Sequence, residues 1–374
     1  DNMSEFMGVR VDATGEAVHA ATAVVADILA PVGEVTKGSH GYVVNGLENA
    51  SFKAINLLWN AGVPVRRVDD TVSIEMGQLD PGDWVVSAVA PDDVVAEIAE
   101  STGINFYPLE QDITSRSRPV ERRRIAMYQR YFGGNSDEGW TRWLLEDFEF
   151  PYTSIFDARI LEDDLIDDFD VLILPADGVA RLTGETDSEG GGGGFGPPPA
   201  AQYPPEYRSG FGQAGVDAIK AFVEAGGTLV TFAEAGDFAI QKLDLPLRNG
   251  VAGLPSREFW SPGSTLEVRV DNTNPFAYGM PDRTLVAFLA GSQVYEVVPG
   301  SRNHTVTRVV EFIDRDILRS GWLIGEEHLS NKATMVTVDV GRGTVVLIGF
   351  RAQHRAQTHG TFKLVFNALV SGPE

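Results

Sequence analysis

Three short, nearly all-apolar segments constrain the fold of this 374-residue chain more than any other feature of its sequence. They are 170–175 (DVLILP), 228–232 (TLVTF) and 345–350 (VVLIGF). Strands of this composition are typical of parallel sheets that are covered by helices on both faces. Apolar residues at helical spacing follow or precede them, at 140–148 and 216–223. This alternation of strands and helices predicts an α/β fold with a doubly wound sheet.

The organisation of the chain predicts two domains. Residues 1–115 form a small α/β domain, in which short apolar strands alternate with helical patterns. The polar span 110–124 is expected to be the linker. Residues 116–374 form the larger domain, which includes a Gly/Pro-rich surface loop at 184–212 and a β-rich part at 262–343.

Composition excludes several function classes. The chain has 30 Lys and Arg against 53 Asp and Glu, a net charge of −23, which repels nucleic acids and anionic lipid surfaces. It has no cysteine, so disulfides, thiolate nucleophiles and cysteine-bound metals are excluded. No apolar run approaches the ~20 residues of a membrane helix. The first residues do not have the pattern of a signal peptide, so none is expected there.

Motif searches give no cofactor or metal. Residues 210–215 match the dinucleotide-binding pattern GxGxxG, but a Pro-rich loop rather than a strand precedes them, which favours a loop. His354 and His359 form a lone pair after the last apolar strand, and no third metal ligand lies nearby in the sequence. We therefore expect no metal site, and a structural or hydrogen-bonding role for both histidines.

The candidate site lies at the carboxyl edge of the predicted sheet, where open α/β folds bind ligands. Five polar residues follow two of the apolar strands: Glu234, Asp237, Arg351, His354 and His359. One interpretation is a polar pocket for an anionic or carbohydrate-like ligand. The other is structural: the two acids cap a helix and pair with arginine to fix the sheet edge. The sequence favours the structural interpretation slightly and leaves both open.

The sequence resembles the C-terminal region of large exported bacterial zinc-carboxypeptidase-like proteins. In those proteins a small α/β segment and a class I glutamine amidotransferase-like domain follow the peptidase domain. The resemblance covers almost the whole chain, including residues 7–11, which are similar to the stretch just after the peptidase domain. The segments that carry it are 137–146 (DEGWTRWLLE), 170–175 (DVLILP), 259–264 (FWSPGS), 274–281 (NPFAYGMP), 320–329 (SGWLIGEEHL) and 350–363 (FRAQHRAQTHGTFK).

This resemblance implies a flavodoxin-like or amidotransferase-like second domain and also implies that it is inactive. The peptidase domain is not in this chain. The amidotransferase fold places a cysteine on the turn after its central strand and a histidine and a glutamate after a later strand. The corresponding residues here are Glu234, Arg351 and Gln353, and a carboxylate cannot replace the thiolate.

The sequence therefore predicts a non-catalytic C-terminal module of a secreted metallocarboxypeptidase-like protein, outside the cell or in the periplasm. Its expected roles are assembly, attachment or substrate presentation, and its expected partners are copies of itself or a covalently linked peptidase domain. Two alternatives stay open. One is a self-assembling extracellular filament protein, for which the loop at 184–212 is a candidate arm. The other is a hydrolase with an unrecognised site at the sheet edge.

Overall fold

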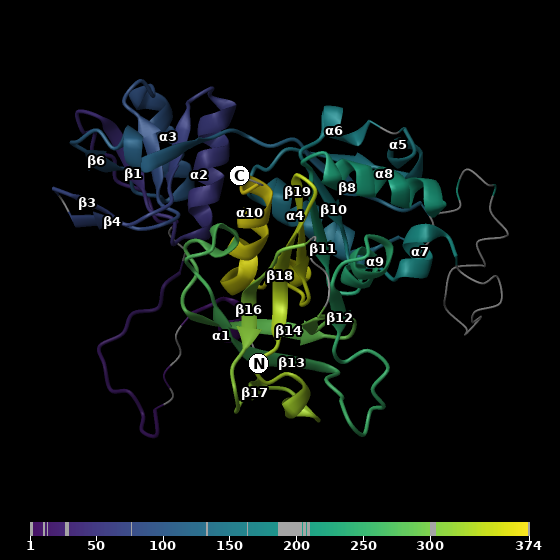
Figure 1. Ribbon diagram of the computed structural model, residues 1–374. Coiled ribbons are helices and arrows are strands. Elements are labelled where there is room, and N and C mark those ends of the chain that lie inside the picture. The colour runs from purple at the N-terminus through teal and green to yellow at the C-terminus, as the bar shows by residue number, and fades with distance from the viewer. Residues whose placement is uncertain are drawn as a thin grey trace. The chain divides into compact units, whose positions relative to one another are not determined.

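A computed structural model of the chain divides into two compact units, Asp1–Arg122 and Arg123–Glu374 (Figure 1). We describe each unit by itself. The residues that the structure describes are 3–9, 12, 14–26, 30–75, 77–131, 134–162, 164–185, 204, 207, 210–299 and 304–372. Most of the predicted loop arm at 184–212, including the segment 186–203, lies outside them.

The first unit contains an antiparallel sheet with the strand order β6-β1-β5-β2-β7. Apart from β7 and a small hairpin, its elements follow one another as β-α-β-β-α-β, the ferredoxin-like arrangement. The elements are α1 (Met3–Phe6), β1 (Gly41–Val44), α2 (Asn49–Asn60), β2 (Val65–Val68), the hairpin β3 (Val72–Ile74) and β4 (Gly77–Leu79), β5 (Trp84–Ser87), α3 (Asp92–Thr102), β6 (Tyr107–Leu109) and β7 (Ser117–Val120).

The expected linker at 110–124 is wrong, because it contains strand β7. This strand pairs with all of β2, from Val65 opposite Val120 to Val68 opposite Ser117. Its composition is polar because it is an edge strand, and an edge also tolerates Pro119, which has no N–H to donate. The first unit therefore ends at Arg122 rather than at residue 115.

The second unit contains the doubly wound sheet that the apolar segments predicted. Five parallel strands have the order β9-β8-β10-β11-β19, which is the flavodoxin-like order 2-1-3-4-5 in sequence terms. The elements of this part are β8 (Ile125–Tyr128), α4 (Ser136–Asp147), β9 (Tyr152–Ile155), α5 (Asp157–Ile160), α6 (Leu165–Asp168), β10 (Val171–Leu174), α7 (Val179–Thr183), α8 (Gly212–Glu224), β11 (Thr228–Phe232), α9 (Ala235–Lys242), β19 (Gly343–Ile348) and α10 (Phe362–Val370).

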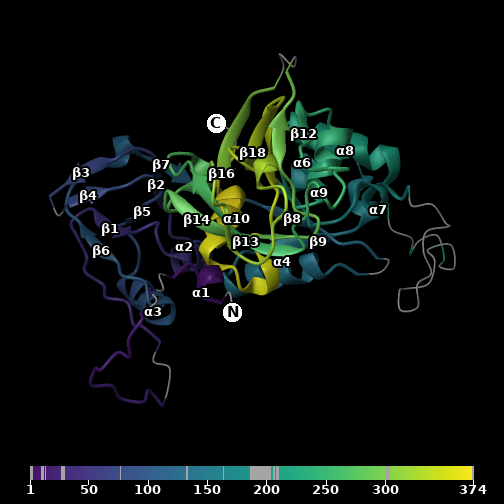
Figure 2. The ribbon, with the colours of Figure 1, turned by 90° about the horizontal axis from the view of Figure 1, so that it is seen from below.

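Helices cover both faces of these parallel strands (Figures 1 and 2). On one face, Phe222 of α8 and Phe238 of α9 belong to the same buried cluster as Leu172 and Leu229 of the strands. On the other, Phe148, which directly follows α4, packs against Phe366 of α10, with ring centroids 4.6 Å apart. Burial on both faces is the physical reason for the nearly all-apolar strand sequences.

The β-rich part of the second unit continues the same sheet. After β19 the strand order runs β18-β16-β13-β14, and all of these pairs are antiparallel. The strands of this part are β12 (Leu247–Asn249), β13 (Gly263–Val270), β14 (Arg283–Leu289), β15 (Tyr295–Val297), β16 (Val306–Phe312), β17 (Leu318–Ser320) and β18 (Ala333–Val340).

Two short elements and one side chain differ from what the sequence pattern indicates. The edge strand β9 was not predicted, because its sequence YTSI has neither an apolar run nor a clear alternation of apolar and polar residues. Trp143 is one of the apolar residues at helical spacing in 140–148, but its side chain is 59% exposed. The GxGxxG segment leads into α8 after helix α7 and a segment outside the described residues, and Phe211 within it is buried.

Within the described part of the chain, no helix is long and apolar enough to span a membrane.

Candidate functional site

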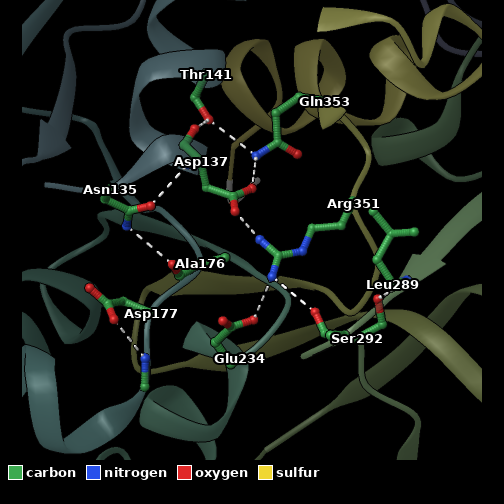
Figure 3. Close-up of polar contacts among 12 residues, drawn as sticks. Asn135, Asp137, Thr141, Ala176, Asp177, Glu234, Leu289, Ser292, Arg351 and Gln353 are labelled. Atoms are coloured by element: carbon green, nitrogen blue, oxygen red, sulfur yellow. Dashed lines mark hydrogen bonds and ion pairs between the residues drawn. The ribbon is translucent and has the colours of Figure 1, made fainter. Parts of the chain in front are cut away.

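The guanidinium of Arg351 lies between two carboxylates at the carboxyl edge of the parallel strands (Figure 3). Arg351 follows β19, and its side chain is only 11% exposed. Its Nη1 pairs with Oδ2 of Asp137, in the first turn of α4. Its Nη2 donates to Oε2 of Glu234 and to the carbonyl oxygen of Ala290, both at 3.0 Å. Burial lowers the pKa of Arg351.

A second set of hydrogen bonds holds Asp137 in place. Gln353, fully buried, donates from Nε2 to Oγ1 of Thr141 at 3.1 Å and to Oδ1 of Asp137 at 3.4 Å. Asn135 caps α4 by accepting a hydrogen bond from the Asp137 N–H at 3.0 Å, and donates to the Ala176 carbonyl at 3.1 Å. The carboxylate of Asp137 thus lies at a helix N-terminus, where the helix dipole also favours it.

The turn after β11 positions Glu234. Ala233, which precedes it, is buried and has a positive φ of 44°, so the chain turns sharply at the strand end. The Glu234 carboxylate lies directly against Gly291, where an added Cβ would come within 2.1 Å of Oε2. Burial raises the pKa of Glu234, and the nearby carboxylates of Asp177 and Asp237 act in the same direction. A Cβ at residue 291 would therefore require the end of the Glu234 side chain to move from its present position.

An open cavity of about 600 Å³ lies beside this network. It is at the switch point between β8 and β10, where the strand order reverses and open α/β sheets bind ligands. Asp177, only 4% exposed, pairs with Nε of Arg130 at 3.1 Å and more loosely with Arg181 at 3.7 Å. Burial raises the pKa of Asp177. The residues that line the cavity are Arg130, Gly134, Asn135, Ser136, Ala176, Asp177, Arg181 and Glu234.

The structure brings together Glu234 and Arg351 of the five predicted site residues. Asp237 is on α9, where it accepts a hydrogen bond from Gln293, and burial raises its pKa. His354 packs edge-on against Trp140, with ring centroids 4.8 Å apart, and His359 packs against Phe362 at 4.7 Å. Asp237, His354 and His359 are not among the residues that line the cavity.

The two histidines have separate environments. Burial lowers the pKa of His354, as do the charges of Arg355 and Arg351. Burial also lowers the pKa of His359, while Asp147 acts in the opposite direction. Trp140 and Asp147, which contact or face these rings, lie about two turns apart on α4. In the part of the chain that the structure describes, no three His, Asp or Glu residues are grouped so that they could hold a metal ion.

Arg130 and Asp177, which follow strands β8 and β10, were not predicted as site residues. Asp177 follows β10, one of the predicted strands, just as Glu234 follows β11, so its position was the available signal. Arg130 follows β8 in the same way. Asp137 was not among the predicted site residues either. Its pairing with Arg351 joins residues 214 positions apart, and no local pattern indicates such a contact.

Comparisons with known proteins do not assign a family. No family model matches the sequence, and no curated protein matches it. The solved structures that it resembles include a putative GMP synthase component from Thermoplasma acidophilum (8% identity, 67% of this chain, 95% of that chain, TM-score 0.38). They also include PurLQS from Thermotoga maritima, with 17% identity over 66% of this chain and 97% of that chain and a TM-score of 0.40. A putative ThuA-like protein from Bacteroides uniformis has 12% identity over 70% of this chain and 93% of that chain and a TM-score of 0.36. The strand order β9-β8-β10-β11-β19 defines the fold independently of these similarities.

Proposed function

We propose that the second unit is a catalytically inactive, amidotransferase-like module of a secreted metallocarboxypeptidase-like protein, and that it serves assembly. The observation that carries the inactive assignment is the ion pair between Glu234 and Arg351. Glu234 follows β11 and Arg351 follows β19, which are the places where an amidotransferase has its cysteine and histidine.

The chemistry of these side chains argues against glutamine hydrolysis. The reaction needs a nucleophile that attacks an amide and a neutral base that takes its proton. Arg351 is a cation without an acceptor atom, so it cannot act as that base. Its two carboxylate partners, Asp137 and Glu234, instead make it a buried cross-link between the ends of two neighbouring strands and a helix.

The catalytic part of the proposal is tested by ammonia release from L-glutamine and by C-terminal trimming of peptides. We expect neither activity from the purified chain. Activity that survives repurification and disappears in the Glu234→Ala variant would overturn the inactive assignment. Arg355→Ala, which changes an exposed cation outside the Arg351 network, is the matched control for any general effect on the preparation.

The assembly part has its own measurement. Light scattering and electron microscopy of the purified chain are expected to show particles larger than one 40.5-kDa chain. An elongated particle would favour the alternative of a filament protein, which is assembly of an open kind. A single-chain mass at every concentration and salt level would overturn assembly as the role.

A hydrolase at the sheet edge is the second candidate, and one observation favours it. Asp177 and Glu234 both line the cavity, and burial raises the pKa of both carboxyls. Raised pKa values are frequent at catalytic acids, although structural ion pairs produce them too. We would test 4-nitrophenyl esters and glycosides with the chain and with its Asp177→Asn and Glu234→Gln variants. Turnover that both substitutions abolish would replace the inactive assignment.

A further inference from the structure

A group of arginines lies on the antiparallel end of the sheet in the second unit. We call it the arginine surface: Arg269 on β13, Arg283 on β14, Arg308 on β16 and Arg319 on β17. Their side chains are between 42% and 65% exposed. Among the described residues they form ion pairs with two carboxylates, those of Glu267 and Glu311, so four cations share two anions in these pairs. In a chain of net charge −23 such an excess is unusual.

The contacts within the arginine surface hold the guanidiniums in place without neutralising them. Glu267 pairs with both Arg283, at 3.1 Å, and Arg319. Glu311 pairs with both Arg269, at 2.8 Å, and Arg308, at 3.0 Å. Arg269 lies directly opposite Arg283 in the register of β13 and β14. Like charges directly opposite each other on neighbouring strands destabilise a sheet. The stability of the fold therefore gives no reason for a second arginine beside Glu267 and beside Glu311.

The reverse pattern occurs on α5 and α6. We call it the acidic surface: one arginine, Arg159, lies among the carboxylates of Glu162, Asp164 and Asp168 at 3.5, 2.8 and 2.6 Å. The three acids are between 56% and 63% exposed, whereas Arg159 is only 19% exposed. The cation is therefore covered and the acids face solvent, which leaves an excess of two negative charges.

The two surfaces belong to opposite ends of one sheet. The arginine surface is on β13, β14 and their neighbours, and β14 is the last strand at its end of the strand order. The acidic surface is on the connection between β9 and β10, and β9 is the last strand at the other end. A contact between them in two copies is heterologous, so each added copy leaves one surface of each kind open.

We infer that the arginine surface binds the acidic surface of a second copy of this chain, head to tail. The inference rests on the proposed assembly function. Arginine can grip carboxylates through two parallel hydrogen bonds, so the exposed guanidiniums fit the exposed carboxylates of the acidic surface. The overall charge of −23 repels other copies at long range. Local complementarity then selects one orientation and one pair of surfaces.

An exposed tryptophan pair next to the arginine surface supplies an apolar contact. Trp322 follows Arg319 by three residues, and its ring meets that of Trp260 edge-on with centroids 5.0 Å apart. The two side chains are 59% and 37% exposed. Ser264 fixes the loop, because its Oγ donates to the Trp322 carbonyl at 2.6 Å and accepts from the Trp322 N–H at 3.1 Å. Tryptophan and arginine are among the residues most enriched in binding hot spots.

Charge reversal with rescue tests the inference by sedimentation velocity at 50 mM and 500 mM NaCl. One variant carries Arg283→Glu and Arg308→Glu, and the other carries Asp164→Lys and Asp168→Lys. We expect each variant alone to associate about tenfold more weakly than the parent chain or not at all. An equimolar mixture is expected to assemble again. The reversed arginine surface of one variant then meets the reversed acidic surface of the other, and the two unreversed surfaces also have opposite signs. Association of the parent chain is expected to weaken at high salt.

Matched controls change the net charge equally at exposed positions outside both surfaces. They are Arg116→Glu with Arg355→Glu, and Glu97→Lys with Asp217→Lys. Thermal melts identify any variant that does not fold. If the lysine variant does not fold, a variant with Asp164→Asn and Asp168→Asn replaces it. We expect this variant alone to associate more weakly than the parent chain. Assembly of the parent chain that neither reversal weakens would overturn the inference and leave the proposed assembly function in place. A parent chain that stays monomeric would overturn both the inference and the proposed assembly function.

Discussion

Arg351 donates a hydrogen bond to Glu234 across 3.0 Å, although 117 positions separate the two residues in the sequence. The strands that they follow, β19 and β11, are parallel neighbours, so their carboxyl ends meet at one edge of the sheet. Under the proposed function, these are the two strand ends at which an amidotransferase has its catalytic cysteine and histidine. The structure places a cation between two carboxylates there, and this ion pair joins the two strand ends.

The first prediction concerns this cross-link. Arg351→Met leaves the buried carboxylate of Asp137 and the partly buried one of Glu234 without their cation. Removal of one partner of a buried ion pair costs about 3–5 kcal/mol, so we expect a loss of that order in the free energy of unfolding. Urea denaturation measures it. The triple variant, which adds Asp137→Asn and Glu234→Gln to Arg351→Met, is expected to recover part of the lost stability. If Arg351→Met causes no loss, the ion pairs of Arg351 do not stabilise the fold.

The second prediction compares two glycines. Gly291 and Gly253 both have positive φ angles, 84° and 73°, but only Gly291 lies against another group. An alanine at residue 253 has only the backbone penalty, about 1–2 kcal/mol. An alanine at residue 291 also places its Cβ 2.1 Å from the Glu234 carboxylate. The end of the Glu234 side chain then has to move away from Arg351, with which it pairs at 3.0 Å. We therefore expect Gly291→Ala to lower the denaturation midpoint more than Gly253→Ala, and equal effects would show that the Glu234–Arg351 contact adds little to stability.

The third prediction concerns the cap of α4. Asn135 accepts from the Asp137 N–H and donates to the Ala176 carbonyl, so it joins the helix to the end of β10. Loss of an N-cap typically costs about 1 kcal/mol, within a range of about 0.5–2 kcal/mol, and we expect Asn135→Ala to fall in that range. Asn135→Asp is the control, because it retains the capping oxygen and loses only the donor to Ala176. If chemical denaturation gives Ala and Asp variants equal stability, the cap is not the main role.

The parallel strands could be predicted from the sequence because burial on both faces leaves a direct record in composition. The strands β10, β11 and β19 each contain a nearly continuous apolar run. The edge strands β7 and β9 could not be predicted in this way. Each is short and partly exposed, and their sequences SRPV and YTSI satisfy an edge position without an apolar pattern.

The candidate site was half predictable for a related reason. Glu234 and Arg351 follow strongly patterned strands, so their meeting at the sheet edge follows from the parallel topology. Asp237 follows the same strand as Glu234, but it is already on helix α9 and bonds to Gln293. Helix geometry fixes the direction in which the Asp237 side chain leaves α9. Which group it meets there depends on tertiary packing, which the sequence pattern does not contain.

The last prediction concerns pH. His354 packs on Trp140, and burial together with the charges of Arg355 and Arg351 lowers its pKa in the folded chain. The unfolded value is about 6.5. A lowered histidine pKa means that folding favours the neutral ring. Its contribution to stability is therefore complete above about pH 6.5 and is lost as the pH falls through the folded pKa.

His359 has a pKa shift in the same direction, so both rings should destabilise the fold when they become charged. We expect the urea concentration at the denaturation midpoint to decrease as the pH is lowered from about 7.5 to about 5.5. The decrease is expected to be smaller in the double variant that carries His354→Gln and His359→Gln. The buried carboxyls of Asp177 and Glu234 have raised pKa values and act with the opposite sign in the parent and the variant alike. The difference between the two chains therefore isolates the histidines. An identical pH dependence in both chains would show that these rings already contact water in the folded state.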